Sequence, residues 1–138
     1  MPVKTEFLHV KTCGNTAMID ITSSIDEIIQ KQQIQEAAVV VSVEGSTASI
    51  INIEYELGLL DDFPAMLEKI APSNAQYKHD QTWHDGNGHA HLRASMLGNS
   101  KMFALYNGEL QIGTWQQIVL VDFDNKPRVR KVIVQILC

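Results

Sequence analysis

The last third of the chain is a succession of short segments that favour β-strands, and this pattern limits the possible folds more than any other feature. The segments "KMFALY" and "ELQIG" flank Asn107 and Gly108. An Asn-Gly pair is the strongest short hairpin signal, because a two-residue type I′ turn needs a positive φ at both positions. The segments "QQIVLVDF" and "RVRKVIVQI" flank the turn-forming residues 124–127 in the same way. This region therefore predicts antiparallel hairpins.

Earlier in the chain, strand-forming segments alternate with two helical patterns. "VKTEFLHVKT" and "TAMIDIT" are expected to form a hairpin, and "AAVVVSV" and "SIINIEYE" follow as two further strands. A capping box of Ser24 and Glu27 predicts a first helix that ends near Glu36. A second, amphipathic helix is expected between Gly58 and Pro72. This order predicts an α+β fold in which two helices pack against an antiparallel sheet.

Length and composition indicate one ordinary globular domain, residues 1–138. The chain is 45% hydrophobic and 20% charged, which excludes a disordered or fibrous protein. It has no run of the roughly 20 apolar residues that a membrane span needs, and its first residues lack the pattern of a secretory signal. Cys13 and Cys138 do not form a disulfide framework. We therefore expect a cytoplasmic protein with free thiols.

The net charge of −5 argues against nonspecific binding to nucleic acid or to anionic membranes. Basic residues nevertheless concentrate after residue 92, among them Arg93, Arg128 and Arg130. Because guanidinium groups bind phosphate well, these three are candidates for holding a phosphorylated ligand. Residues 45–48 could add the hydroxyls of Ser46 and Thr47.

Four of the five histidines lie in "YKHDQTWHDGNGHAHL", residues 77–92. On an extended segment His89 and His91 would face the same way and could bind one metal ion. His79 could complete a three-nitrogen set and Glu54 could add an oxygen, as in a catalytic divalent metal site. The alternative is a histidine-rich surface loop without metal.

A second interpretation makes His79 and His91 a general acid and base, with Glu54 orienting one of them. Thr114, Trp115 and Gln116, at the start of an apolar strand, could then line a pocket for a flat polar ring. Core packing of Trp115 is an equally open alternative. For Arg128 and Arg130, a solvated sheet face is the more common outcome.

Three ordered motifs, "GSTASIINIEYELGLLDDF", "YKHDQTWHDGNGHAHLRASMLG" and "GELQIGTWQQIVLVDFDNKPR", closely resemble the YjbQ family, whose members are also described as secondary thiamine-phosphate synthases. The resemblance implies an antiparallel sheet rolled into a half-barrel and a homotrimer. It also implies a weak transferase activity that joins a pyrimidinylmethyl diphosphate to a thiazole phosphate and releases pyrophosphate.

Ten positions of this sequence match the motifs of the YjbQ family: Glu54, His79, His91, Arg93, Ser95, Gly98, Gly113, Thr114, Trp115 and Gln116. Residues 45–48 read Gly-Ser-Thr-Ala, where many relatives have His-Thr-Ser-Ala, so a role of that histidine does not transfer. On this basis Glu54, His79, His91 and Gln116 are candidate catalytic residues. The candidate substrate-binding residues are Ser46, Thr47, Arg93, Ser95, Thr114, Trp115, Arg128 and Arg130.

Expelling a diphosphate requires cationic groups, a divalent ion, or both. Three histidines favour zinc or manganese over magnesium, which prefers oxygen ligands. Two other functions remain open: a metal-dependent hydrolase or isomerase of another phosphorylated metabolite, and a binding module without catalytic activity.

Overall fold

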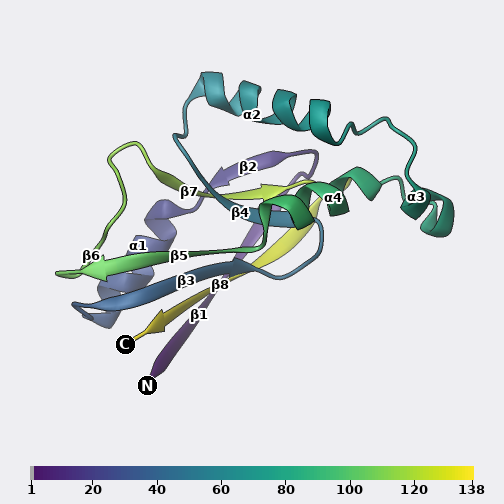
Figure 1. Cartoon of the computed structure of the whole chain (residues 1–138). Helices are drawn as coiled ribbons and strands as arrows, with labels where there is room; N and C mark the ends of the chain where they lie inside the picture. Colours follow the sequence, from purple (N-terminus) through teal and green to yellow (C-terminus); the bar gives the residue numbers. More distant parts are fainter. Residues whose placement is uncertain (1) are drawn as a thin grey trace.

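The computed structural model describes residues 2–138, which form two layers of strands with helices at their margins (Figure 1). In chain order the elements are β1 (Val3–Thr12), β2 (Ala17–Asp20), α1 (Thr22–Gln32), β3 (Ala37–Val43), β4 (Ala48–Ile53), α2 (Leu57–Ile70), α3 (Lys78–Trp83), α4 (Gly88–Leu97), β5 (Ser100–Tyr106), β6 (Glu109–Leu110), β7 (Gln117–Asp122) and β8 (Arg128–Leu137).

The strands form a five-stranded sheet in the order β1-β8-β3-β5-β6 and a three-stranded sheet in the order β2-β7-β4. All neighbouring strands are antiparallel. The two sheets curl around a shared interior (Figure 1), which confirms the predicted α+β half-barrel. Residues 2–138 form four helices rather than two, because the histidine segment contributes α3 and α4.

The main core lies between the two sheets and is closed by α1. Alternate residues of β3 and β8, among them Val41 and Val134, point into it and meet Ile25 of α1. A second core lies on the other face of the small sheet, where Val121 of β7 packs with Leu67 of α2. Because β7 is covered on both faces, its sequence is a continuous apolar run rather than an alternating one.

Of the predicted hairpins, only the one at Asn107 and Gly108 is confirmed, although its second strand is limited to Glu109–Leu110. Both turn residues have positive φ, +51° and +74°, and Tyr106 pairs with Glu109 across the turn. The predicted amino-terminal hairpin is wrong, because β1 pairs with β8 and β2 pairs with β7. The predicted hairpin across residues 124–127 is also wrong, since β7 and β8 belong to different sheets. The connection after Asp122 carries the chain from one sheet to the other.

The helices begin earlier than the sequence suggests. α1 starts at Thr22, whose backbone N–H and hydroxyl both donate to Asp20 Oδ1, so the Ser24–Glu27 capping box is not used. Glu56 accepts hydrogen bonds from two N–H groups at the start of α2. No helix formed by residues 2–138 is long and apolar enough to cross a membrane.

Candidate functional site

The histidine segment is two short helices joined by a turn, not a loop. α3 ends at Trp83 and is followed by His84, whose φ is +59°, and α4 begins at Gly88. The N–H of Gly88 donates to Asp80 Oδ1 over 2.9 Å. A Cβ at Gly88 would lie 2.7 Å from Cβ of Tyr77, which is closer than real Cβ atoms approach. Glycine is therefore required here, because it lets the two helices pack closely enough to bring their side chains together.

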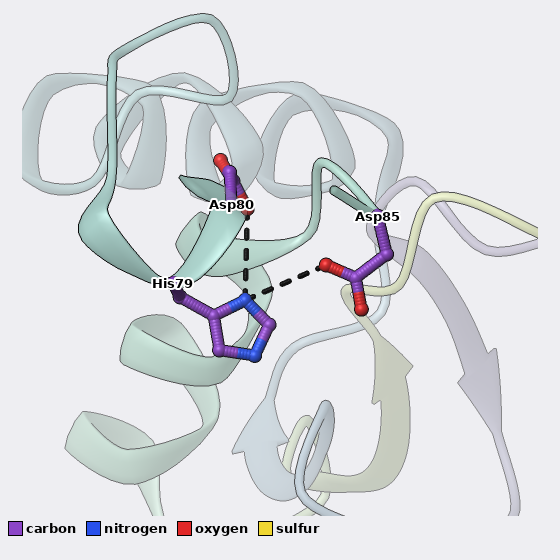
Figure 2. A group of neighbouring side chains, drawn as sticks. All are labelled: His79, Asp80 and Asp85. Atoms are coloured by element: carbon purple, nitrogen blue, oxygen red, sulfur yellow. Dashed lines mark ion pairs between the residues drawn. The ribbon is translucent and has the colours of Figure 1, made fainter. Parts of the chain in front are cut away.

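His79 is the centre of a cluster with two carboxylates (Figure 2). Its Nδ1 lies 3.6 Å from Asp80 Oδ1 and 3.5 Å from Asp85 Oδ1. The His79 ring also packs against that of His91, with ring centroids 4.3 Å apart. The expected association of His79 with His91 is therefore present, although two aspartates outside the predicted catalytic and metal-binding sets complete the cluster.

His89 does not join this cluster. The extended segment that would have aligned His89 with His91 is instead the first turn of α4, where side chains two residues apart diverge by about 200°. His89 is buried among charged groups, and its burial, followed by the nearby Arg93, lowers its pKa. Residues 2–138 therefore do not gather His79, His89 and His91, the predicted metal ligands, into one close group of possible ligands.

A cavity of about 300 Å³ opens beside the cluster and is lined by α4, by the start of β8 and by the connection between β3 and β4. Two arginines, a histidine and a short glycine-containing connection contribute to its walls. The lining residues are Gly45, Ser46, Thr47, Asp85, Asn87, His91, Asp124, Arg128 and Arg130. Since Asp85 also belongs to the His79 cluster, the cluster forms part of the cavity wall.

Both arginines are held in place by buried carboxylates. Arg130 donates from Nε and Nη2 to the two oxygens of Asp122, over 2.8 and 2.7 Å, and from Nη2 to the Thr47 hydroxyl over 2.6 Å. Arg128 donates from Nε to Asp124 Oδ2 over 2.7 Å. Neither terminal nitrogen of Arg128 donates a hydrogen bond within residues 2–138, so both are available to a ligand. Nη1 of Arg130 lies against Gly45, where a Cβ would approach it to 2.7 Å.

These contacts keep the buried carboxylates ionised. Burial by itself would raise the pKa of Asp124, but hydrogen bonds from Asn87, Asn125, Arg128 and Thr47 outweigh it and lower the pKa to about 2. The pKa of Asp122 is also lowered, because hydrogen bonds led by those from Arg130 outweigh the effect of burial. For His91, burial and then the proximity of His79 lower the pKa.

A larger cavity of about 560 Å³ shares Gly45, Ser46 and His91 with the first. Its remaining lining is mostly apolar or small and consists of Ala48, Leu92, Ala94, Ser95, Gly98 and Asn99. Two predicted substrate-binding residues, Ser46 and Ser95, thus lie at cavity walls. Thr47 lines the smaller cavity, but its hydroxyl already bridges Arg130 and Asp124.

Arg93, a predicted substrate-binding residue, lines neither of these two cavities. Only 2% of the residue is exposed. Its guanidinium donates to the carbonyl oxygen of Ala71, the hydroxyl of Thr16 and the carboxylate of Glu68. Arg93 therefore ties α4 to the end of α2 and to the turn before β2, which is a structural role.

The other predicted residues lie at the opposite end of the small sheet. Ile53, next to Glu54, pairs with Gln117, next to Gln116, whereas Ala48 pairs with Asp122 near the cavity. At about 3.4 Å per residue, the six residues of β4 separate the two ends by roughly 17 Å. Figure 1 shows the connection between β6 and β7, which carries Thr114 and Trp115, far from α3. Within one chain these residues do not meet the histidines.

The buried aspartates were absent from the predicted site, although the sequence carries a signal for them. In "IVLVDFD" two acids, Asp122 and Asp124, close an apolar strand, and two arginines follow after a tight turn. Acids at the end of an apolar strand need partners when they are buried, and the arginines are the nearest candidates along the chain. The sequence therefore predicts ion pairs between these aspartates and arginines, but it does not predict the adjacent cavity.

The fold and the site define a small α+β half-barrel protein with a polar cavity beside a histidine–carboxylate cluster. Residues 6–138 match the model of the family described as UPF0047 protein YjbQ-like. A UPF0047 protein of Archaeoglobus fulgidus is 38% identical over 130 residues, which cover 94% of this chain and 98% of that protein. UPF0047 protein YugU of Bacillus subtilis is 30% identical over 132 residues, covering 94% and 96% of the two chains.

Solved structures agree over nearly the whole length. A hypothetical protein from Aeropyrum pernix K1 has a TM-score of 0.90 and 30% identity, with 97% of this chain and 98% of that chain covered. A YbjQ-like protein of unknown function from Sulfolobus solfataricus P2 has a TM-score of 0.88 and 32% identity, with 99% of each chain covered. The chain belongs to the UPF0047 protein YjbQ-like family, as its motifs indicate.

Proposed function

We propose that the chain is an enzyme that binds a phosphorylated small molecule in the smaller cavity and acts on it with His91. The observation that carries the proposal is that one cavity of about 300 Å³ brings together Arg128, Arg130 and His91. Guanidinium groups recognise phosphate through paired, charge-assisted hydrogen bonds. A positioned imidazole can donate a hydrogen bond to a reacting group or exchange a proton with it.

The buried carboxylates support this proposal because they fix the arginines before a ligand arrives. Asp122 and Asp124 engage one side of each guanidinium, which leaves terminal nitrogens of Arg128 and Arg130 for a ligand. Charged groups that are already oriented lose little free energy to reorganisation when charge develops on a substrate. The larger cavity, with Ala48, Leu92 and Ala94 in its walls, has room for the organic part of the same molecule.

The reaction we propose first is the one implied by the family resemblance, the formation of thiamine phosphate. In it the thiazole nitrogen forms a bond to the methylene carbon of the pyrimidine diphosphate, and the carbon–oxygen bond to the diphosphate breaks. The diphosphate leaves with the bonding electrons, so negative charge develops on its oxygens. Arg128 and Arg130 would stabilise this charge, and an N–H of His91 would hydrogen-bond the departing group.

We further propose that the chain forms a homotrimer and that a second copy completes the site. Glu54, Trp115 and Gln116 match family motifs yet lie roughly 17 Å along the sheet from the cavity. Trp115 is 71% exposed, which is unusual for a large aromatic side chain within one chain. The outer face of the five-stranded sheet also exposes large apolar side chains, namely Val3, Phe7, Met102, Tyr106 and Val129. A neighbouring copy would cover these surfaces. It would also bring its own Glu54, Trp115 and Gln116 to the cavity that contains His91.

Pyrophosphate release tests the proposed reaction. Wild-type protein should release pyrophosphate only when the pyrimidine diphosphate and the thiazole phosphate are both present. Arg128→Ala and His91→Ala should reduce the rate by at least about tenfold while each variant remains folded at the assay temperature. Lys126→Ala, which removes a positive charge from the exposed turn just before Arg128, is the matched control and should keep the rate.

No release above background by the wild type would rule out this reaction for the chain. If a phosphorylated compound still raised the melting temperature of the wild type but not of Arg128→Ala, the cavity would instead serve a binding module or another phosphate-dependent activity. A hydrolase and an isomerase of another phosphorylated metabolite are the activities to assay next.

A further inference from the structure

We infer that His79, Asp80 and Asp85 form a binding site for one divalent transition-metal ion of the zinc type. The inference rests on the geometry of these three side chains and does not depend on the proposed reaction. Their ligand atoms, Nδ1 of His79 and one oxygen of each aspartate, all lie within 4.8 Å of one another (Figure 2).

Nδ1 of His79 has no hydrogen-bond partner among residues 2–138, although it is withdrawn from solvent. The nearest carboxylate oxygens are 3.6 and 3.5 Å away. A hydrogen bond between nitrogen and oxygen is usually about 2.7 to 3.2 Å long, so the cluster is too wide to be closed by hydrogen bonds alone. A buried nitrogen left in this state costs about 1 to 3 kcal/mol, which a bound ion would remove.

The width of the cluster also fits a tetrahedral ion. Nitrogen and oxygen ligands lie about 2.0 to 2.1 Å from zinc, so neighbouring ligands of a tetrahedral ion are about 3.4 Å apart. Octahedral magnesium at about 2.1 Å would bring neighbouring ligands to about 3.0 Å. The separations of 3.5 and 3.6 Å from Nδ1 fit the tetrahedral ion better. A nitrogen ligand favours the same choice, because magnesium prefers oxygen.

Contacts around the cluster hold the ligands in place. The N–H of Gly88 donates to Asp80 Oδ1, and the amide of Asn125 donates to the carbonyl oxygen of Asp85 over 2.6 Å. The His79 ring packs against His91. Such surrounding contacts are typical of metal sites, since they fix the orientation of the ligands before the ion binds.

Three protein ligands leave a fourth position of a tetrahedral ion open to water or substrate. Because Asp85 also lines the smaller cavity, the ion would lie at the wall of that cavity. There it could contact a phosphate oxygen of a bound ligand and act together with Arg128. This last step rests on the proposed function, whereas binding of the ion does not.

Calorimetric titration with zinc chloride, in buffer without phosphate and after treatment with a chelator, tests the inference. We expect one ion per wild-type chain and affinity at least about tenfold lower in His79→Ala and in Asp85→Asn. His9→Ala removes an exposed histidine of β1 that lies outside the cluster and should bind as the wild type does. Bound cobalt should give the strong visible absorption of a tetrahedral ion in the wild type and should lose it in His79→Ala.

Folding of the variants is checked by their melting temperatures without metal, which should stay close to that of the wild type because His79 and Asp85 are partly exposed. Absence of zinc binding to the wild type would overturn the inference. Equal zinc affinity in the wild type and in folded His79→Ala would overturn it as well. Because no substrate is present, either result is independent of the outcome of the pyrophosphate assay.

Discussion

The guanidinium of Arg130 and the carboxylate of Asp122 form a two-point ion pair inside the half-barrel, with hydrogen bonds of 2.8 and 2.7 Å. Their side chains are 7% and 0% exposed. The pair connects β8 of the large sheet to β7 of the small sheet at the edge of the cavity. It therefore holds the two sheets together and also orients one of the cationic groups that would meet a ligand.

Asp122→Ala should lower the free energy of unfolding by about 3 to 5 kcal/mol, because it leaves Arg130 buried without its main partner. Urea unfolding of the two proteins measures the difference. The matched control is Glu44→Ala, which breaks the exposed pair between Glu44 and Lys131 and should cost less than about 1 kcal/mol. If both variants lost the same free energy of unfolding, the buried pair would contribute no more to stability than the exposed pair.

The ionisation of Asp124 should make the free energy of unfolding depend on pH in acid. Its pKa in the folded chain, about 2, lies below its ordinary value of 3.8, so the ionised form stabilises the folded state. That stabilisation, about 2 kcal/mol, is complete above the unfolded value and is lost as the pH falls from 3.8 through 2. The stability difference between wild type and Asp124→Asn should therefore shrink from about pH 5 to about pH 2. A difference that stayed constant over this range would refute the assignment.

Gly45→Ala should impair ligand binding more than an ordinary glycine replacement. Gly45 has a φ of +124°, and a Cβ there would approach Arg130 Nη1 to 2.7 Å, so the substitution displaces the guanidinium and narrows the cavity. Gly98→Ala is the control, because φ is +83° but a Cβ would meet nothing within 4 Å. Backbone strain should cost each variant about 1 to 3 kcal/mol, whereas only Gly45→Ala should also weaken binding of pyrophosphate. Similar affinities in the two variants would argue against contact between ligand and Arg130.

Light scattering should give a mass three times that of the 15.4 kDa chain. If copies share sites, Glu54→Gln and His91→Ala should each be inactive alone, yet mixed trimers refolded from the two variants should recover part of the activity. Recovery is expected because some boundaries would combine an intact Glu54 with an intact His91 from the neighbouring copy. A monomer, or a trimer whose mixture stays inactive, would contradict the shared site.

The sequence predicts local features well because their causes lie within a few residues. The turn at Asn107 and Gly108 is one case, since the two residues themselves supply the positive φ. The partner of β1 is different, because the alternation of apolar residues selects a face but not the neighbouring strand. The pairing of Val3 with Leu137 joins the two ends of the chain and depends on the whole sheet.

The candidate site shows the same limit. Arg93 and Arg128 are both arginines that follow the histidine segment. Arg93 connects two helices in the interior, whereas Arg128 lines the cavity. Only the tertiary structure separates these roles. The association of His79 with His91 was expected, whereas the exclusion of His89 follows from a helix that begins one residue before it.

The central claim is that the cavity between Arg128, Arg130 and His91 binds a phosphorylated ligand, and calorimetric titration with pyrophosphate tests it most directly. We predict saturable binding to the wild type and unchanged affinity in Lys126→Ala. Arg128→Ala should bind about ten- to a hundredfold more weakly, because one charge-assisted hydrogen bond contributes about 1.5 to 3 kcal/mol. Absence of binding to the wild type, or the same affinity in folded Arg128→Ala as in the wild type, would contradict the claim.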